Sequence, residues 1–117
     1  MERKNVIQEK SYSFALKIMK FTFSIPKSSS LSIVINQLLR SGTSIGANVE
    51  EAIAAFSKED FLYKMNIALK EARESNYWLR LIRDSGVKLD YDITAMIEDS
   101  VELCKILSAI VKSSKNV

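Results

Sequence analysis

Glycine and proline are scarce in this chain, and their scarcity limits the folds that are open to it. Of 117 residues, three are glycine and one is proline. Strands and the tight turns between them need more frequent interruption by these residue types. Most of the chain must therefore lie in long helices, and its length suffices for one domain with one core. We predict a single all-α domain over residues 1–117.

Apolar residues recur at intervals of three and four along four segments, which is the spacing of one face of a helix. The predicted helices cover residues of about 11–25, 30–55, 57–85 and 92–113. The links between them are short, and short links favour antiparallel neighbours. We therefore expect an antiparallel up-and-down four-helix bundle.

Stop and cap residues support these bounds. Pro26 ends the first helix, because the residue before a proline is pushed out of the α region. Ser57 can cap the third helix and Gly86 can end it. Asp90 or Asp92 can cap the fourth helix, and the sequence leaves that choice open.

Gly42 and Gly46 lie inside the second predicted helix, where a glycine costs about 1 kcal/mol relative to alanine. They are one turn apart and share a face, so another backbone could approach closely there. We expect such a contact; the alternative is a break into two shorter helices near Gly42. The segment lacks the lysine of a phosphate-binding loop.

The first and fourth helices each carry two apolar stripes, whereas a helix in a lone small bundle needs one. On the first helix they are Tyr12, Leu16, Met19 and Phe23, and Phe14, Ile18, Phe21 and Ile25. On the fourth they are Ile93, Ile97, Ser100, Cys104, Leu107 and Val111, and Met96, Leu103, Ile106 and Ile110. The second and third helices carry one main stripe each, from Leu31 to Phe56 and from Phe61 to Ile82. The spare stripes predict a homo-oligomer; a wide core stripe inside a monomer is the alternative.

Several classes of catalytic chemistry lack their residues. The chain has no histidine and a single cysteine, Cys104. This excludes Ser-His-Asp and Cys-His nucleophile pairs, the usual zinc sites and the Glu-x-x-His ligands of di-iron bundles. We expect no metal, no cofactor, no small-molecule substrate and no enzymatic activity.

Paired carboxylates remain as candidates for acid–base work or for binding a hard cation. Glu71 and Glu74 lie one turn apart on the third helix. Lys70 and Arg73 lie within a turn of Glu74, and Arg40 is available from the second helix, so we predict ion pairs between helices in place of catalysis. Trp78 lies one residue off the main stripe of its helix, which places it at the core edge or at an interface.

Two basic stripes are the candidate binding sites. Lys10, Lys17, Lys20 and Lys27 recur at intervals of 7, 3 and 7, and Lys70, Arg73, Tyr77 and Arg80 at intervals of 3, 4 and 3. A basic stripe with an aromatic side chain can follow a phosphate backbone and stack a base. The alternative is the solvated face of a helix, and Glu74 and Asp84 lie close to the second stripe. A net charge of +3 permits contact with nucleic acid without requiring it.

The N-terminal residues are polar and lack the apolar run of a signal peptide. No apolar run approaches the ~20 residues of a membrane span. We therefore expect a cytoplasmic protein with no membrane partner.

Separate blocks of the sequence resemble a known signature. They are RSGTSIGANVEEA at residues 40–52, DF at 60–61, IALKEARE at 67–74 and YWL at 77–79. The blocks occur in the order and at the spacing of a bacterial four-helix bundle family, named for proteins encoded in 23S rRNA intervening sequences. The resemblance in letters covers about residues 37–82.

The resemblance implies an up-and-down bundle that assembles as a ring, typically a homopentamer. It also implies similarity to the accessory variability determinant of diversity-generating retroelements, which partners a reverse transcriptase and contacts nucleic acid. The motif residues, implied to be structural, are Arg40, Gly42, Ser44, Gly46, Asn48, Glu51, Glu71, Glu74 and Trp78. The leading hypothesis is a non-enzymatic oligomeric module that binds RNA or a nucleic-acid enzyme. The alternative is a scaffold whose partner is another protein.

Overall fold

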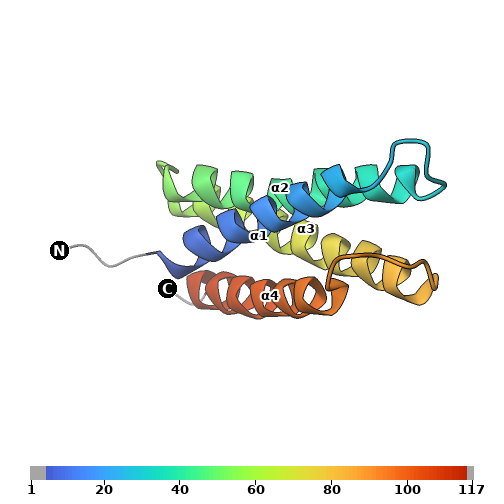
Figure 1. Cartoon of the computed structure of the whole chain (residues 1–117). Coiled ribbons are helices and arrows are strands. Elements are labelled where there is room, and N and C mark those ends of the chain that lie inside the picture. Colours follow the sequence, from blue (N-terminus) through green and yellow to red (C-terminus); the bar gives the residue numbers. More distant parts are fainter. Residues whose placement is uncertain (1–4, 116–117) are drawn as a thin grey trace.

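The computed structural model describes residues 5–115 as four helices that run alternately up and down (Figure 1). They are α1 (Val6–Ser24), α2 (Ser32–Ile53), α3 (Lys58–Asp84) and α4 (Ile93–Lys115). Each helix packs against the next, and α1 closes the bundle against α4. The predicted all-α up-and-down bundle is confirmed. Within the described range, no helix has the length and apolar character needed to cross a membrane.

Two helix ends differ from their predicted positions. α1 begins at Val6 and not near residue 11, because Asn5 caps it by accepting a hydrogen bond from the backbone N–H of Gln8 at 3.0 Å. The prediction started this helix at its first full apolar stripe and missed the cap. α2 ends at Ile53, so Phe56 lies beyond the helix and is fully exposed. The prediction that Phe56 extends the buried stripe of α2 is wrong.

α2 begins at Ser32 without a side-chain cap, and the ends of α3 and the start of α4 agree with their signals. Ser57 caps α3 through its side-chain oxygen. Asp92, one of the two predicted candidates, caps α4 with its carboxylate 3.1 Å from the backbone nitrogen of Thr94. Gly86 follows α3 with a φ of 80°, a left-handed conformation that glycine adopts without strain.

One of the two apolar stripes of α1 faces the core. Its buried members are Phe14, Ile18 and Phe21. The other stripe is exposed, with Tyr12 at 64%, Leu16 at 42% and Phe23 at 70% of their full accessibility. The bundle therefore leaves a line of large apolar side chains uncovered along α1.

The two predicted stripes of α4 form one wide surface that faces the core. Met96 and Leu103, predicted for the second stripe, are buried like Ile97 and Leu107 of the first. The other two members of the second stripe are half-buried against the same core. α4 packs against both α1 and α3, and contact with two neighbours needs a buried face wider than one stripe. The prediction of a spare stripe on α4 is therefore wrong.

Gly42 and Gly46 form the contact between α2 and α1, and α2 is continuous through both. A Cβ atom at Gly42 would lie 3.0 Å from Cγ2 of Ile18, and one at Gly46 would lie 3.4 Å from the backbone oxygen of Ser11. Both glycines are buried, so α1 rests against the backbone of α2. The predicted close approach is confirmed, and the alternative break near Gly42 does not occur.

Gly46→Leu should destabilise the bundle, because the added side chain would meet the backbone of α1 at Ser11. We expect the free energy of unfolding to fall by about 1–3 kcal/mol, the usual cost of overpacking. Urea denaturation followed by circular dichroism measures it. Gly46→Ala is the matched control, because its methyl group would meet α1 at an ordinary contact distance. An unchanged midpoint for Gly46→Leu would contradict the close contact.

Candidate functional site

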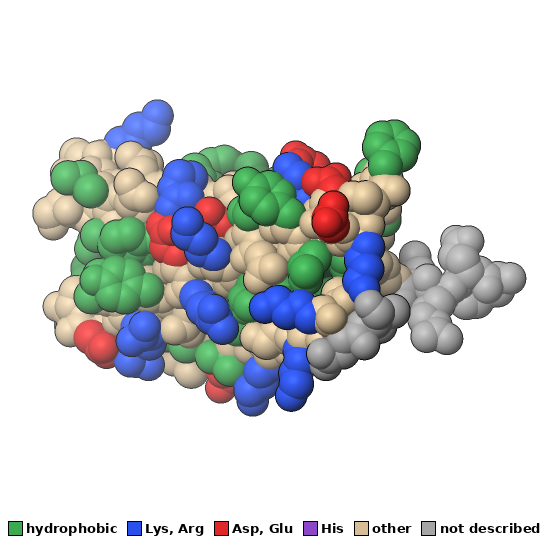
Figure 2. All heavy atoms as spheres, turned by 180° about the vertical axis from the view of Figure 1, so that it is seen from behind, with side chains coloured by type: hydrophobic (Ala, Val, Ile, Leu, Met, Phe, Trp, Pro, Cys, Tyr) green, Lys and Arg blue, Asp and Glu red, His purple; other side chains and the backbone are tan. Residues whose placement is uncertain are grey.

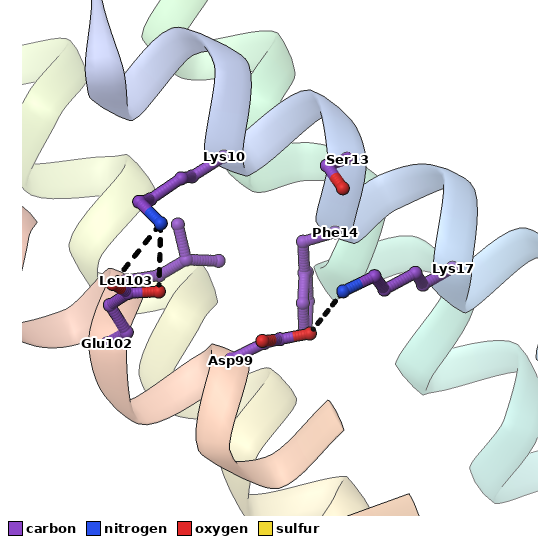
Figure 3. A pocket seen from close by; sticks show the side chains of 7 residues that line it. All are labelled: Lys10, Ser13, Phe14, Lys17, Asp99, Glu102 and Leu103. Atoms are coloured by element: carbon purple, nitrogen blue, oxygen red, sulfur yellow. Dashed lines mark hydrogen bonds and ion pairs between the residues drawn. The ribbon is translucent and has the colours of Figure 1, made fainter. Parts of the chain in front are cut away.

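Two lysines of the basic stripe on α1 pair with acids on α4. Lys10 Nζ lies 3.2 Å from a carboxylate oxygen of Glu102, and Lys17 Nζ lies 2.9 Å from one of Asp99. Figure 3 shows the two lysines reaching toward α4 on either side of Phe14, around a small cavity of about 80 Å³. These pairs link α1 to α4 and neutralise two of the four cations that the sequence places in this stripe.

The other two lysines of that stripe lie in different surroundings. Lys20 is exposed near the end of α1, and its backbone carbonyl accepts a hydrogen bond from the Tyr91 hydroxyl at 3.2 Å. Lys27 follows Pro26 in the link between α1 and α2. The four lysines therefore do not form the single helix face that their spacing predicted.

The paired carboxylates of α3 share one cation. Arg40 on α2 forms ion pairs with Glu71, at 3.1 Å, and with Glu74. The indole N–H of Trp78 donates a hydrogen bond to the same carboxylate of Glu74 at 3.0 Å. The side chains of Glu71 and Glu74 are 14% and 26% exposed, so the network joins α2 to α3 at the edge of the core. The predicted ion pairs between helices are confirmed, and Trp78 lies half-buried against the core.

Two residues of the predicted α3 stripe, Arg73 and Arg80, line a groove between α3 and α4, whereas Lys70 and Tyr77 are exposed outside its lining. Its lining residues are Arg73, Asn76, Arg80, Val101, Cys104, Lys105 and Ser108, and it encloses about 660 Å³. Figure 2 shows lysine and arginine side chains gathered over α3 and α4 on this side of the molecule. In the part of the chain that the structure describes, three cations and no carboxylate line the groove. Burial raises the pKa of the Cys104 thiol, and the charge of Arg73 offsets part of that rise.

A second groove lies where α1 ends and α2 begins. Its lining residues are Thr22, Phe23, Ile25, Pro26, Lys27, Ser32, Ile35, Asn36 and Leu39, around about 740 Å³. Phe23 also belongs to the exposed stripe with Tyr12 and Leu16, so the stripe and this groove are continuous. We call them together the α1 apolar surface. The sequence predicted the stripe but not the groove, because the groove depends on how the link returns the chain to α2.

No set of three or more histidine, cysteine, aspartate or glutamate side chains within residues 5–115 is placed to hold a metal ion. Several acids are held instead by single cations, as Glu71 and Glu74 are by Arg40 and Glu102 is by Lys10.

Comparison with known proteins agrees with the sequence motif. Residues 3–109 match the family described as 23S rRNA-intervening sequence proteins. The chain belongs to this family. It is also similar to a crystal structure from Bacteroides thetaiotaomicron of a protein with unknown function from the S23 ribosomal protein family. The two chains are 41% identical with a TM-score of 0.82, over 92% of this chain and 96% of that one. No curated protein matches the chain.

The polar motif residues of α2 lie on one helix face, at intervals of four, four and three. Ser44 donates a hydrogen bond to the carbonyl of Arg40 at 2.7 Å, and Asn48 donates one to the carbonyl of Ser44 at 2.9 Å. Glu51 forms an ion pair with Lys64 of α3 at 2.7 Å, and this contact raises the pKa of Lys64. The face therefore joins α2 to α3 at both ends of its length.

Sequence reasoning missed two contacts of this helix pair. Lys64 was not identified as the partner of Glu51, because nothing in its spacing marks it. The buried hydroxyls of Ser41 and Ser75 lie 2.9 Å apart and join α2 to α3 inside the core. Both serines sit among apolar positions, which was the available signal for a buried polar contact.

Arg40→Met should destabilise the bundle more than Lys10→Met does. Loss of Arg40 leaves two largely buried carboxylates without their cation, and we expect the free energy of unfolding to fall by about 1–3 kcal/mol. Lys10 and Glu102 are both half-exposed, and such a pair contributes about 0–1 kcal/mol. Chemical denaturation of the two variants gives the comparison. Equal losses would show that the Arg40 network is no more than a surface ion pair.

Proposed function

We propose that this protein is a non-enzymatic interaction module that assembles into a homo-oligomer and binds nucleic acid. The α1 apolar surface is the observation that carries the proposal. Three large side chains on one face of α1 are exposed, and they continue into an apolar groove. A contiguous exposed patch of this kind is typical of a protein–protein contact surface.

A second exposed apolar face supports a ring. α3 exposes the large apolar side chains of Tyr63 and Leu81. α3 makes no packing contact with α1 within the described residues, so the two faces lie on different sides of the bundle. A cyclic assembly with more than two subunits needs two different surfaces on each subunit. This arrangement fits the homopentamer that the family resemblance implies.

The carboxylates support a role without catalysis. A general acid or base must be free to reach a substrate. Glu71 and Glu74 are held instead by Arg40, and Glu74 also accepts the Trp78 indole hydrogen bond. Loss of these contacts would weaken the packing of α2 against α3, so the two carboxylates have a structural role.

The charges of α3 and α4 support nucleic acid as the partner. Lysine and arginine gather on that side of the molecule (Figure 2), while the lysines at positions 10 and 17 of α1 are neutralised by α4. Cationic surfaces bind phosphates and release counterions as they do so. A protein partner would be favoured instead if no nucleic acid bound at low salt.

The assembly has a direct test in light scattering coupled to gel filtration. We expect a mass several times the 13.2 kDa of one chain. Leu16→Glu with Phe23→Glu should reduce that mass toward the monomer, because charge on the α1 apolar surface opposes its burial. Phe56→Glu is the control, because Phe56 is fully exposed but lies outside that surface. A monomeric wild-type protein at micromolar concentration would end the proposal of a homo-oligomer.

A further inference from the structure

We propose that the groove between α3 and α4 binds single-stranded nucleic acid, with its cations on the phosphates and Tyr77 stacked on a base. The inference rests on the proposed function, which names nucleic acid as the partner, and it assigns the site and the strand type. The site combines residues of α3 and α4, whereas each basic stripe predicted from the sequence lies on a single helix.

The cations of the groove come from both walls and are free to bind an anion. Arg73 and Arg80 are two turns apart on α3, a separation of about 10 Å along the helix axis. Lys105 lines the opposite wall, and Lys112 lies two turns further along α4, also exposed. Among the described residues, none of these four cations forms an ion pair. The groove therefore offers a track of positive charge with no internal counter-ion.

The acids that lie near these cations in the sequence are turned elsewhere in the fold. Glu74 faces α2, where it pairs with Arg40. Asp84 pairs with Arg83 at 2.8 Å, and that hydrogen bond lowers the pKa of the Asp84 carboxyl; the charge of Arg80 lowers it further, although Asp84 forms no ion pair with Arg80 and does not line the groove. Glu98 is exposed on α4 one turn before the groove begins and does not line it. Glu74 and Asp84, which lie close to the α3 basic stripe in the sequence, therefore do not line the groove, and its lining remains positively charged.

The basic stripe of α1 is the weaker candidate for the same reason. Lys10 and Lys17 are already paired with Glu102 and Asp99 of α4. A phosphate would have to displace those carboxylates before it could bind. Lys20 alone would remain of the three lysines within α1. The cations of the groove have no carboxylate partner, so they should contribute most of the binding energy for nucleic acid.

Tyr77 gives the groove a preference for single strands. Its ring is 46% exposed and packs edge-on against Trp78, with ring centroids 5.0 Å apart. The Arg80 guanidinium lies 5.9 Å from the Tyr77 ring centroid, which places the aromatic beside the cation track. Unstacked bases can reach such a ring, whereas the bases of a duplex are stacked inside it. The aromatic should therefore add affinity for a single strand alone.

Asn76 holds one of these cations in place. Its side-chain oxygen accepts a hydrogen bond from Arg80 Nε at 2.8 Å, and its amide nitrogen donates one to Ser100 of α4 at 3.0 Å. The Arg80 guanidinium is thus tied to both helices and keeps its remaining N–H groups for a ligand. A pre-positioned cation loses less conformational freedom on binding than a flexible one does.

The test uses fluorescence anisotropy with a labelled 20-nucleotide single strand of mixed sequence and the matching duplex, at about 50 and 200 mM salt. The groove variant Arg73→Gln/Arg80→Gln/Lys105→Gln should bind the single strand at least about tenfold more weakly at low salt. Its slope of log affinity against log salt should be shallower by about two, because three phosphate contacts are lost. Lys10→Gln/Lys17→Gln/Lys20→Gln removes the same charge from α1 and should change affinity by about twofold or less.

Tyr77 variants test the strand preference. Tyr77→Ala should weaken single-strand binding by about tenfold and leave duplex binding unchanged, while Tyr77→Phe keeps the ring and should bind like the wild type. Circular dichroism and light scattering establish that each variant keeps its fold and its mass, so that lost avidity is not mistaken for a lost contact.

Three outcomes would overturn the inference. If the α1 variant loses binding and the groove variant keeps it, nucleic acid binds the other face and the proposed function stands. If the duplex binds as tightly as the single strand and Tyr77→Ala has no effect, the strand assignment is wrong. If the wild type binds neither strand at low salt, both the inference and the nucleic-acid part of the proposed function fail, while the light-scattering result still decides the assembly.

Discussion

The contact of α1 with the backbone of α2 sets the orientation on which the other surfaces depend. Ile18 lies against Gly42 and the backbone of Ser11 lies against Gly46, and a Cβ atom at Gly42 would lie only 3.0 Å from Ile18. This contact turns Phe14 and Phe21 inward and leaves Tyr12, Leu16 and Phe23 outside. It also directs Lys10 and Lys17 toward α4. The apolar surface proposed for assembly and the loss of free charge on α1 therefore have one cause.

The same bundle contains two kinds of cationic surface. On α1, lysines meet the acids of α4 across the helix interface, and each pair is half-exposed or nearly so. On the opposite side, Arg73, Arg80 and Lys105 border a groove that no described carboxylate lines. The net charge of +3 does not reveal this division, because charge counts ignore which cations already have a partner. Local charge, and not the total, decides where a phosphate chain could bind.

The residues that carry the family resemblance have two tasks in the fold. Arg40, Glu71, Glu74 and Trp78 form one polar network, and Glu51 with Lys64 forms a second joint along the same helix pair. Arg73, from the same sequence blocks, lines the groove between α3 and α4, and Tyr77 is exposed beside Arg80, which also lines it. α3 thus stabilises the bundle through the face that meets α2, and its neighbouring face borders the groove. The two glycines of the motif, Gly42 and Gly46, allow α1 to pack closely against α2.

Helix periodicity, caps and breakers are local properties, so the sequence by itself determined the four helices, their order and most of their ends. The motif blocks were sufficient to identify the family. Arg40 was one of three cations, with Lys70 and Arg73, that the sequence offered to Glu71 and Glu74, and the fold selects Arg40. Tertiary structure alone decided which stripe of α1 faces inward, and that the stripes of α4 merge. It also decided which cations are free, since Lys10 and Lys17 find acids 92 and 82 residues away. Burial and charge pairing depend on distances in space between helices, and intervals along one helix do not contain them.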